Sequence, residues 1–332
     1  MRCAIIGSGT WGSALAQVLA DNGQEIIIYG IDKKEIEDIK LNHKNTKYFG
    51  EEVVLNSVIE ATNNLSEALN NAEVIVVAVP TFAVRGVLKE MKPLITNRPY
   101  IVSVAKGFDP DTFKRMSEVI REEIPSSLRQ EVVSLIGPGH AEEVILRKLT
   151  CITATSIDVE AGEVIQKLFA NPYFRVYVQT DEVGAEYGVA IKNAIAIASG
   201  ITQGIGMGDN AKAALATRGL VEMIRFGTYF GGKIDTFMGL TGIGDLMVTC
   251  NSPHSRNYQA GYEIGKNNSA SEFLSNNKKT VEGIRTTKII YDLAKANNIN
   301  MPIIDAVYKV LFEDANPLDV VYQLMTRELK KE

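Results

Sequence analysis

A glycine-rich turn near the start of the chain constrains the fold more than any other feature of the sequence. Residues 4–6 form an apolar run, and Gly7, Gly9 and Gly12 follow it at the spacing G-x-G-x-x-G. Apolar residues then recur through residues 14–19 as they do in a helix. The sequence therefore predicts a strand, a tight turn and a helix, the unit that binds a dinucleotide. In such a unit the pyrophosphate approaches the glycine backbone and the free N–H groups of the helix.

An acidic residue supports this interpretation. Residues 25–29 predict a second strand, and Asp32 lies just past its end, about 20 residues after the glycine turn. An acid at that place accepts a hydrogen bond from a ribose hydroxyl. The competing interpretation is a signal peptide, because Met1-Arg2 precedes an apolar stretch. Glycine and hydroxyl residues interrupt that stretch within residues 7–13, whereas the apolar segment of a signal peptide is continuous, so we favour the dinucleotide unit.

Length and charge limit the classes of protein to consider. Because 332 residues are too many for one ordinary core, we expect two domains. They are a dinucleotide-binding Rossmann domain over residues 1–182 and an α-helical substrate-binding and catalytic domain over residues 183–332. The net charge of -5 gives no general attraction to nucleic acid or acidic membranes. No apolar run approaches the roughly 20 residues of a membrane helix, so we expect neither a nucleic-acid partner nor membrane insertion.

Cysteine and histidine are scarce. The cysteines are Cys3, Cys151 and Cys250, and the chain has three histidines. Their spacing fits no usual set of metal ligands, so we expect metal-free chemistry. Three cysteines cannot form a closed set of disulfides, and they are interpreted as reduced, small hydrophobic residues. We therefore expect a protein of the reducing cytoplasm.

Several apolar runs predict the strands of a doubly wound α/β sheet. Residues 74–79 form a run that Pro80 ends, as is typical of a parallel strand buried on both faces. Residues 101–105 and 132–136 repeat the arrangement. The remaining predicted strands are residues 53–54 as an edge strand, 151–155 and 175–178. Ligands bind at the carboxyl ends of the strands in such sheets.

The residues that follow these strand ends are candidate ligand contacts. Phe82 follows the predicted strand at residues 74–79, where it either contacts the cofactor or belongs to the core. Lys106 follows the predicted strand at residues 101–105 and is either functional or an ordinary solvated lysine. The predicted strand at residues 132–136 leads into residues 137–141, Gly-Pro-Gly-His-Ala.

The second half of the chain has the periodicity of helices. The predicted segments are residues 185–204, 211–230, 257–266, 281–297, 302–312 and 318–329. Lys192 is the only ionisable residue between Gly188 and Ile201, and a helix that is apolar all round is buried. Burial lowers the pKa of an ammonium and makes the lysine a proton acceptor near neutral pH. The alternative is a lysine whose stem passes apolar neighbours to reach solvent, and we favour the functional interpretation.

Two other positions of the second half suggest ligand binding. Ser255, Arg256 and Asn257 precede a helical segment and offer a hydroxyl, a guanidinium, an amide and free N–H groups. A phosphate or carboxylate fits this set, and a plain helix N-cap is the alternative. Asp245 follows a glycine-rich joint, where it either caps a helix or binds substrate hydroxyls.

These positions together resemble one family, the bacterial-type NAD(P)-dependent glycerol-3-phosphate dehydrogenases. The resemblance spans nearly the whole chain. It rests on Gly7-Ser8-Gly9-Thr10-Trp11-Gly12, Ser103-Val104-Ala105-Lys106-Gly107, Gly137-Pro138-Gly139-His140-Ala141, Lys192-Asn193, Gly244-Asp245-Leu246, Ser255-Arg256-Asn257 and Glu282-Gly283. It implies reversible hydride transfer between dihydroxyacetone phosphate and sn-glycerol 3-phosphate, which feeds glycerophospholipid synthesis. The family also implies a homodimer.

The resemblance also implies a role for each matching residue. Lys192 is the expected proton acceptor in oxidation and donor in reduction. Lys106 holds and stabilises the substrate oxygens, and Asp245 orients the hydroxyls or the lysine. The expected substrate contacts are Lys106, Gly137, Gly139, Lys192, Asp245, Ser255, Arg256 and Asn257. The expected cofactor contacts are Gly7, Gly9, Thr10, Trp11, Gly12, Asp32, Phe82, Lys106, Ala141, Arg256 and Glu282.

Two departures from the family pattern bear on the site. The family usually has Ser or Thr where Gly139 stands, so only a backbone contact carries over. It often has Arg or His at the position of Ile31, where a basic residue serves NADP. Asp32 favours a free 2′-hydroxyl, whereas Lys33 and Lys34 could reach a 2′-phosphate. The sequence thus favours NAD slightly and leaves NADP open.

Two rival functions stay open at this point. The first is a related dehydrogenase acting on a carboxylate-bearing hydroxy acid, because an arginine such as Arg256 recognises carboxylates as well as phosphates. The second is a non-enzymatic NAD(P)-sensing protein. The second rival has no use for a proton donor such as Lys192.

Overall fold

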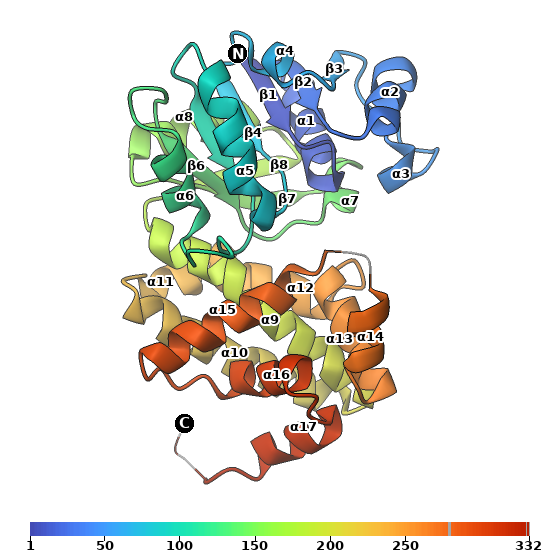
Figure 1. Ribbon diagram of the computed structural model, residues 1–332, viewed down its shortest axis with the longest axis vertical. Helices are drawn as coiled ribbons and strands as arrows, with labels where there is room; N and C mark the ends of the chain where they lie inside the picture. The colour runs from blue at the N-terminus through green and yellow to red at the C-terminus, as the bar shows by residue number, and fades with distance from the viewer. Residues whose placement is uncertain (278–279, 330, 332) are drawn as a thin grey trace. The chain divides into compact units, whose positions relative to one another are not determined.

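The computed structural model describes residues 1–277, 280–329 and 331. The chain forms two compact units, Met1–Glu182 and Val183–Glu332 (Figure 1). The first is an eight-stranded sheet with helices on both faces, and the second is helical. The predicted fold class is therefore confirmed: a Rossmann-type α/β unit followed by an all-α unit.

The sheet of the first unit is parallel over most of its width. The strands are β1 (Arg2–Ile6), β2 (Glu25–Tyr29), β3 (Ile59–Thr62), β4 (Val74–Val77), β5 (Tyr100–Ser103), β6 (Val132–Ile136), β7 (Thr150–Thr155) and β8 (Phe174–Gln179). Their order is β3-β2-β1-β4-β5-β6-β7-β8. β6 and β7 pair antiparallel, whereas every other neighbouring pair is parallel. The last two strands thus run against the first six.

The predicted edge strand at Val53 and Val54 is wrong. Both residues lie in an irregular segment, and Val54 is 61% exposed. The edge strand is β3, a few residues later, where Ile59 and Ala61 are buried and Glu60 between them is exposed. Alternation of buried and exposed residues identifies such a half-buried strand better than a pair of β-branched residues does.

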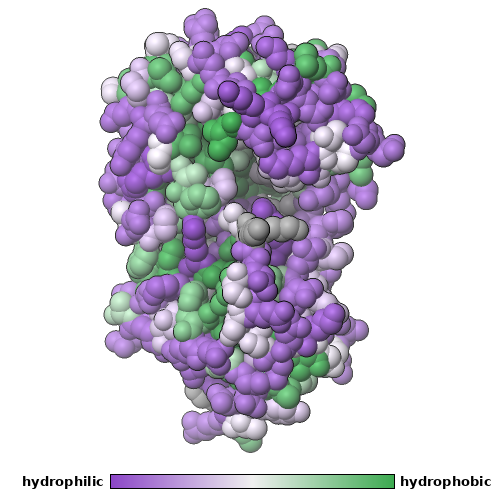
Figure 2. Space-filling model, turned by 45° about the vertical axis from the view of Figure 1, so that its right-hand side comes forward, coloured by the Kyte–Doolittle hydropathy of each residue, from purple (hydrophilic) through white to green (hydrophobic). Residues whose placement is uncertain are grey.

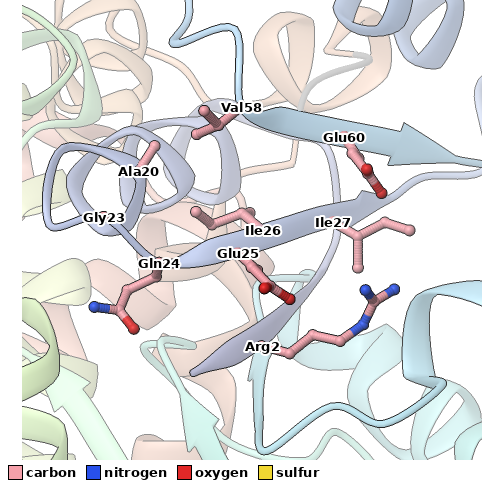
Figure 3. Close-up of a pocket in the computed structure, with 9 residues that line it drawn as sticks. All are labelled: Arg2, Ala20, Gly23, Gln24, Glu25, Ile26, Ile27, Val58 and Glu60. Carbon is pink, nitrogen blue, oxygen red and sulfur yellow. The ribbon is translucent and has the colours of Figure 1, made fainter.

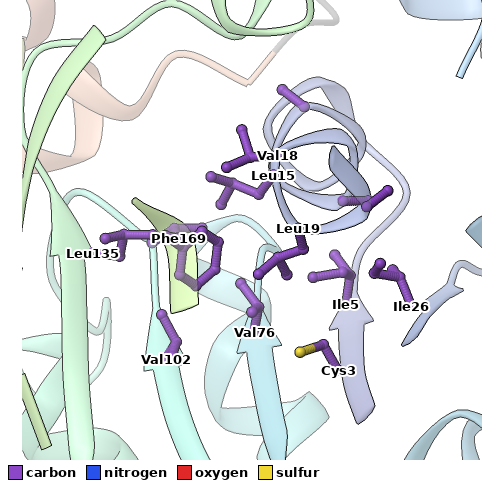
Figure 4. Close-up of a cluster of buried hydrophobic side chains, with 14 of the residues drawn as sticks. Cys3, Ile5, Leu15, Val18, Leu19, Ile26, Val76, Val102, Leu135 and Phe169 are labelled. Carbon is purple, nitrogen blue, oxygen red and sulfur yellow. The ribbon is translucent and has the colours of Figure 1, made fainter. Parts of the chain in front are cut away.

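Helices cover both faces of this sheet. The helices are α1 (Thr10–Asp21), α2 (Lys33–Asn42), α3 (Thr46–Phe49), α4 (Leu65–Leu69), α5 (Thr81–Met91), α6 (Met116–Glu123), α7 (Ala141–Val144) and α8 (Val159–Phe169), with a 3₁₀ turn at Lys92–Leu94. Residues of α1, α2, α7 and α8 pack on one face, and residues of α4, α5 and α6 pack on the other. In the first cluster, Leu19 of α1 and Phe169 of α8 lie among the strand residues Ile5 and Val76 (Figure 4).

The strand register brings the functional loops to one edge. Ile6 at the end of β1 pairs with Val77 at the end of β4, and Val77 pairs with Ser103 at the end of β5. Ser103 in turn pairs with Ser134 of β6. The loops that leave β1, β4, β5 and β6 therefore emerge side by side at the carboxyl ends of the strands, where open α/β sheets bind ligands.

The second unit consists of helices and one π-helical turn. Its elements are α9 (Glu182–Ile205), α10 (Gly208–Tyr229), α11 (Ile234–Phe237), the π-helical turn η2 (Leu240–Gly244), α12 (Asp245–Asn251), α13 (Arg256–Asn267), α14 (Ser271–Asn276), α15 (Glu282–Ala296), α16 (Pro302–Phe312) and α17 (Pro317–Met325). The predicted helical segments correspond to α9, α10, α13, α15, α16 and α17, whereas the short helices α11, α12 and α14 were not predicted. None of the described helices is long and apolar enough to cross a membrane. The face in Figure 2 is mostly hydrophilic, with smaller apolar patches.

Glycines bring α9 and α13 unusually close. A Cβ added at Gly200 of α9 would lie 2.1 Å from the carbonyl oxygen of Tyr258. A Cβ added at Gly261 of α13 would lie 2.1 Å from the carbonyl oxygen of Ile197. Backbone therefore packs on backbone, because interhelical distance depends on the side chains at the contact. This packing fixes the helix that carries Lys192 against the helix that begins at Arg256.

Glu222 on α10 is a buried carboxyl group that caps another helix. Its side chain accepts hydrogen bonds from the backbone N–H of Ile303 (2.7 Å) and Ile304 (3.3 Å) in the first turn of α16. Burial raises the pKa of Glu222 from 4.5 to about 7, although these two N–H groups oppose the rise. Folded Glu222 therefore retains a proton over a pH range in which the unfolded chain has lost it.

This difference predicts a pH-dependent stability. The folded state binds more protons between pH 4.5 and about 7, so the contribution of Glu222 to the free energy of unfolding falls as the pH rises. Relative to wild type, Glu222→Gln should gain about 3 kcal/mol of stability across that window. Urea denaturation at pH 5 and pH 7.5 measures the change. Glu263→Gln, at an exposed position, is the control, and an equal pH dependence in both variants would contradict the assignment.

Candidate functional site

The glycine turn has the shape of a phosphate cradle. Gly7 has a φ of 121°, and a Cβ added to Gly12 would lie 2.0 Å from the Gly7 carbonyl oxygen. A Cβ added to Gly9 meets no atom within 4 Å, so the space above it is open. Helix α1 begins there without a side-chain cap and without an acid in its first turn. Its free N–H groups therefore suit the pyrophosphate of a dinucleotide.

A substitution at Gly9 tests this cradle. Gly9→Ala should keep the fold, because its φ of -69° suits alanine and its Cβ meets no protein atom. The added methyl group occupies the space for phosphate, so the Kd for NADH should rise about tenfold. Isothermal titration calorimetry measures it, with Gly86→Ala of α5 as a control that also adds a Cβ in open space. Unchanged NADH affinity in Gly9→Ala would place the pyrophosphate elsewhere.

Other predicted residues lie on neighbouring loops of the first unit. The Lys106 ammonium donates a 2.7 Å hydrogen bond to the Gly137 carbonyl oxygen, which ties the loop after β5 to the loop after β6. A Cβ at Gly139 would lie 3.1 Å from Cη2 of Trp11. This indole therefore closely approaches the position at which the family usually carries a hydroxyl. The loop after β6 and the start of α1 are thus in contact.

Two predicted cofactor contacts begin helices. Phe82 is the second residue of α5 and is 47% exposed, so the structure does not make it a core residue. Ala141 is the first residue of α7 and is buried. Both helices follow strands of the parallel part of the sheet, β4 and β6.

Asp32 is the N-cap of α2. Its Oδ1 accepts hydrogen bonds from the backbone N–H of Lys34 (2.9 Å) and Glu35 (3.4 Å), and its Oδ2 lies 3.0 Å from the Lys47 ammonium. The hydrogen bond from Lys47 is the largest influence holding the pKa of Asp32 below its usual value. Ile31 beside it is 89% exposed and offers no charge. Asp32 is therefore ionised and already oriented by the protein.

The second unit surrounds the Lys192 side chain with polar partners. Lys192 of α9 is only 7% exposed, and its Nζ lies 2.9 Å from Oδ1 of Asp245, which is 1% exposed. The same ammonium donates to the hydroxyl of Thr249 at 2.7 Å. Asp245 begins α12 and Thr249 lies one turn later, so both reach the lysine from one face of that helix. The buried ammonium is thus held in place by oxygen atoms of Asp245 and Thr249.

The predicted anion-binding residues lie at the start of α13. Ser255 is its N-cap and accepts a 3.2 Å hydrogen bond from the backbone N–H of Tyr258. Arg256 is exposed and forms no ion pair with any residue in the described part of the chain. Helix α13 has twelve residues, no acid in its first turn and a guanidinium beside its free N–H groups. Such a helix start favours an anion.

Asn257 connects three helices. Its Nδ2 donates to Oδ1 of Asn193 on α9 at 2.9 Å, and its Oδ1 accepts from the backbone N–H of Gly283 at 2.9 Å. Glu282, a predicted cofactor contact, is the first residue of α15 and directly precedes that glycine. The amide of Asn257 is thus largely committed to protein contacts, and one N–H of Nδ2 is left for a ligand.

Two members of these networks were not predicted from the sequence. Thr249 and Asn193 contact Lys192 and Asn257, respectively, yet neither was predicted as a site residue. The helical spacing between Asp245 and Thr249 is a signal that could have revealed Thr249. Asn193 belongs to the Lys192-Asn193 pair of the family resemblance, but its contact with Asn257 had no local signal, because the two residues are 64 positions apart.

The three cysteines are free thiols, and burial raises the pKa of both Cys3 and Cys250 to about 12. Within the described ranges, no group of three or more His, Cys, Asp or Glu residues could hold a metal ion. A hollow of about 320 Å³ lies where α1 ends and β2 begins (Figure 3). It is at the opposite end of the strands from the glycine turn, and none of the predicted site residues lines it.

Comparison with known proteins gives the same family for both halves of the chain. Residues 2–162 match the family model of the NAD-dependent glycerol-3-phosphate dehydrogenase N-terminus, and residues 181–322 match that of the C-terminus. A protein of Bacillus cereus (strain B4264) named glycerol-3-phosphate dehydrogenase [NAD(P)+] is 49% identical over 331 residues, which is 100% of this chain and 97% of the relative.

Two solved structures are also similar. The glycerol-3-phosphate dehydrogenase of Coxiella burnetii has a TM-score of 0.90 and 32% identity, over 98% of this chain and 99% of that one. The glycerol-3-phosphate dehydrogenase of Saccharomyces cerevisiae has a TM-score of 0.84 and 25% identity, over 98% of this chain and 99% of that one.

Proposed function

The chain belongs to the NAD-dependent glycerol-3-phosphate dehydrogenase family, and from this premise we propose that it interconverts dihydroxyacetone phosphate and sn-glycerol 3-phosphate. The first unit binds NAD or NADP, and the second carries the proton-transferring lysine and the phosphate-binding residues. The observation that carries this proposal is the buried Lys192 ammonium, held by Asp245 at 2.9 Å and by Thr249 at 2.7 Å.

The reaction moves one hydride and one proton. A dinucleotide held at the glycine turn would supply the hydride to C2 of dihydroxyacetone phosphate in reduction and would receive it from C2 of glycerol 3-phosphate in oxidation. Lys192 gives its Nζ proton to the C2 oxygen in reduction and takes that proton back in oxidation. Asp245 and Thr249 hold the ammonium in one orientation, which lowers the entropy cost of reaching the reactive geometry.

Lys106 stabilises the developing charge. Its Nζ uses one hydrogen for the Gly137 carbonyl oxygen at 2.7 Å, and an ammonium has three. This ammonium can donate to the substrate oxygens as negative charge grows on C2–O in the transition state. Gly137 and Gly139 contribute backbone contacts to the same substrate.

The start of α13 holds the phosphate. Arg256 supplies a forked guanidinium, and Ser255 keeps its hydroxyl hydrogen for donation because its oxygen accepts from the backbone N–H of Tyr258. Asn257 adds its remaining N–H. Binding energy from this phosphate holds C2 in the position for reaction.

The remaining predicted residues hold the cofactor. Those at the glycine turn are Gly7, Gly9, Thr10, Trp11 and Gly12, and those elsewhere are Asp32, Phe82, Lys106, Ala141, Arg256 and Glu282. We further propose a homodimer of the reducing cytoplasm, whose product enters glycerophospholipid synthesis. Sedimentation equilibrium measures the oligomeric state directly.

A spectrophotometric assay tests the function. NADH or NADPH should be oxidised at 340 nm when dihydroxyacetone phosphate is added, and ketopantoate or succinic semialdehyde should give no comparable rate. Turnover of a carboxylate substrate instead would favour the hydroxy-acid rival. Cofactor binding without turnover of any of the three would favour a sensing protein.

A further inference from the structure

A cluster of three charged residues lies at the end of β2, around the residue expected to face the adenosine ribose. It consists of Asp32, Glu35 and Lys47, and we call it the ribose-side cluster. The Lys47 ammonium lies 3.0 Å from Oδ2 of Asp32 and forms a short ion pair with Oε1 of Glu35. One lysine therefore serves two carboxylates, and the cluster carries a formal charge of about -1.

Glu35 is the member that fixes the cluster to the fold. It is 6% exposed, whereas the side chains of Lys47 and Asp32 are 54% and 38% exposed. Its Oε2 accepts a 2.6 Å hydrogen bond from the Ser8 hydroxyl, and its Oε1 accepts one from the Tyr48 hydroxyl at 3.3 Å. Ser8 stands between Gly7 and Gly9, so Glu35 joins the phosphate cradle to the ribose side of the fold.

Lys47 is correspondingly unavailable as an anion-binding group. Two of its three hydrogens are engaged by Asp32 and Glu35. The hydrogen bond with Glu35 is the largest influence raising the pKa of Lys47, so this lysine stays charged and paired. Lys33 and Lys34 are exposed residues of α2, and the attraction of such solvated ammonium groups for an anion is weakened by water and salt.

We propose that Glu35 is a specificity-determining residue: it holds Lys47 against Asp32 and places a second carboxylate beside the ribose, so that the site accepts the 2′-hydroxyl of NAD and disfavours the 2′-phosphate of NADP. The inference rests on the proposed binding of a nicotinamide dinucleotide at the glycine turn. A 2′-phosphate brings about two negative charges at pH 7 and meets two carboxylates whose lysine is already engaged. A 2′-hydroxyl brings no charge and can donate to Asp32.

Equilibrium binding of NADH and NADPH tests the proposal without any turnover. Wild type should bind NADH more tightly than NADPH. Glu35→Gln keeps the size of the side chain, removes one negative charge and leaves Lys47 with Asp32 as its one ion-pair partner among these residues, so the ratio of the Kd values should shift about tenfold toward NADPH. Glu37→Gln removes a charge from an exposed position of the same helix, and its ratio should stay close to that of wild type.

A double-mutant cycle identifies the role of the lysine. In Lys47→Met both carboxylates lose their partner, so NADPH should be disfavoured further. Adding Glu35→Gln to Lys47→Met should recover only the part of its effect that comes from the removed charge, because no lysine is left to be released. If Glu35→Gln does not fold, as judged by thermal melting, the ratio of the NADH and NADPH Kd values in Lys47→Met tests the proposal by itself.

Three results would overturn the proposal: equal affinity of wild type for both cofactors, equal ratios in Glu35→Gln and Glu37→Gln, or an unchanged ratio in Lys47→Met. Failure of the proposed function looks different. In that case dihydroxyacetone phosphate is not turned over with either cofactor, whatever the binding ratio.

Discussion

Replacing Lys192 by alanine should lower kcat by about 10² to 10⁴, the range that follows the loss of a general acid or base. The side chain is 7% exposed and bonded to Asp245 and Thr249, so its loss removes an ammonium that the protein holds in a fixed place. Cofactor affinity should stay nearly unchanged, because the glycine turn belongs to the other unit. Steady-state kinetics with dihydroxyacetone phosphate and NADH calorimetry measure the two effects.

The Lys192→Ala experiment needs a control for protein stability. Removal of the ammonium leaves the carboxylate of Asp245 buried without its cation, which itself destabilises a protein. Thermal melting of Lys192→Ala must therefore show a folded protein at the assay temperature. Lys288→Ala, on the surface of α15, removes an ammonium that is 54% exposed and should keep wild-type kcat. Wild-type turnover in Lys192→Ala would remove this residue from the mechanism.

Replacing Arg256 by alanine should raise KM for dihydroxyacetone phosphate about 10- to 100-fold, the loss expected when hydrogen bonds to a charged group disappear. Arg256 is exposed at the start of α13 and is not engaged by another described residue, so its removal should cost the fold little. The effect on kcat should be smaller, because the phosphate is bound in both the ground state and the transition state.

The same helix offers the matched control. Lys266 is an exposed cation in the last turn of α13, and Lys266→Ala should leave KM unchanged. Inorganic phosphate as a competitive inhibitor provides a second measurement, since its inhibition constant should rise in Arg256→Ala as KM does. An unchanged KM in Arg256→Ala would show that the phosphate binds elsewhere.

Much of the fold could be predicted from local patterns. The G-x-G-x-x-G turn requires glycines for steric reasons that a sequence displays directly, and the structure shows those contacts at Gly7 and Gly12. Helix α16 was predicted with the bounds that the structure gives, Pro302–Phe312, because its apolar period is clear. The edge strand was misplaced, because two valines in a loop resemble a strand when the burial around them is unknown.

The candidate site was predictable only in part. The residue types at Lys106, Lys192 and Arg256 and their resemblance to one family identified candidates. Their partners were not visible, because the hydrogen bonds join residues far apart in sequence. Lys192 and Asp245 are separated by 53 positions, and Asn193 and Asn257 by 64. Such pairs depend on how α9 packs against α12 and α13, which glycines such as Gly200 and Gly261 permit.

The sequence by itself determined the fold class and the family, and it predicted the place of the dinucleotide, since each depends on local spacing and residue type. Tertiary structure decided which side chains work together. It placed Asp245 and Thr249 in contact with Lys192, and it placed Lys47 between Asp32 and Glu35. The physical reason is that charge and hydrogen bonding act over a few ångströms in space, whatever the distance along the chain.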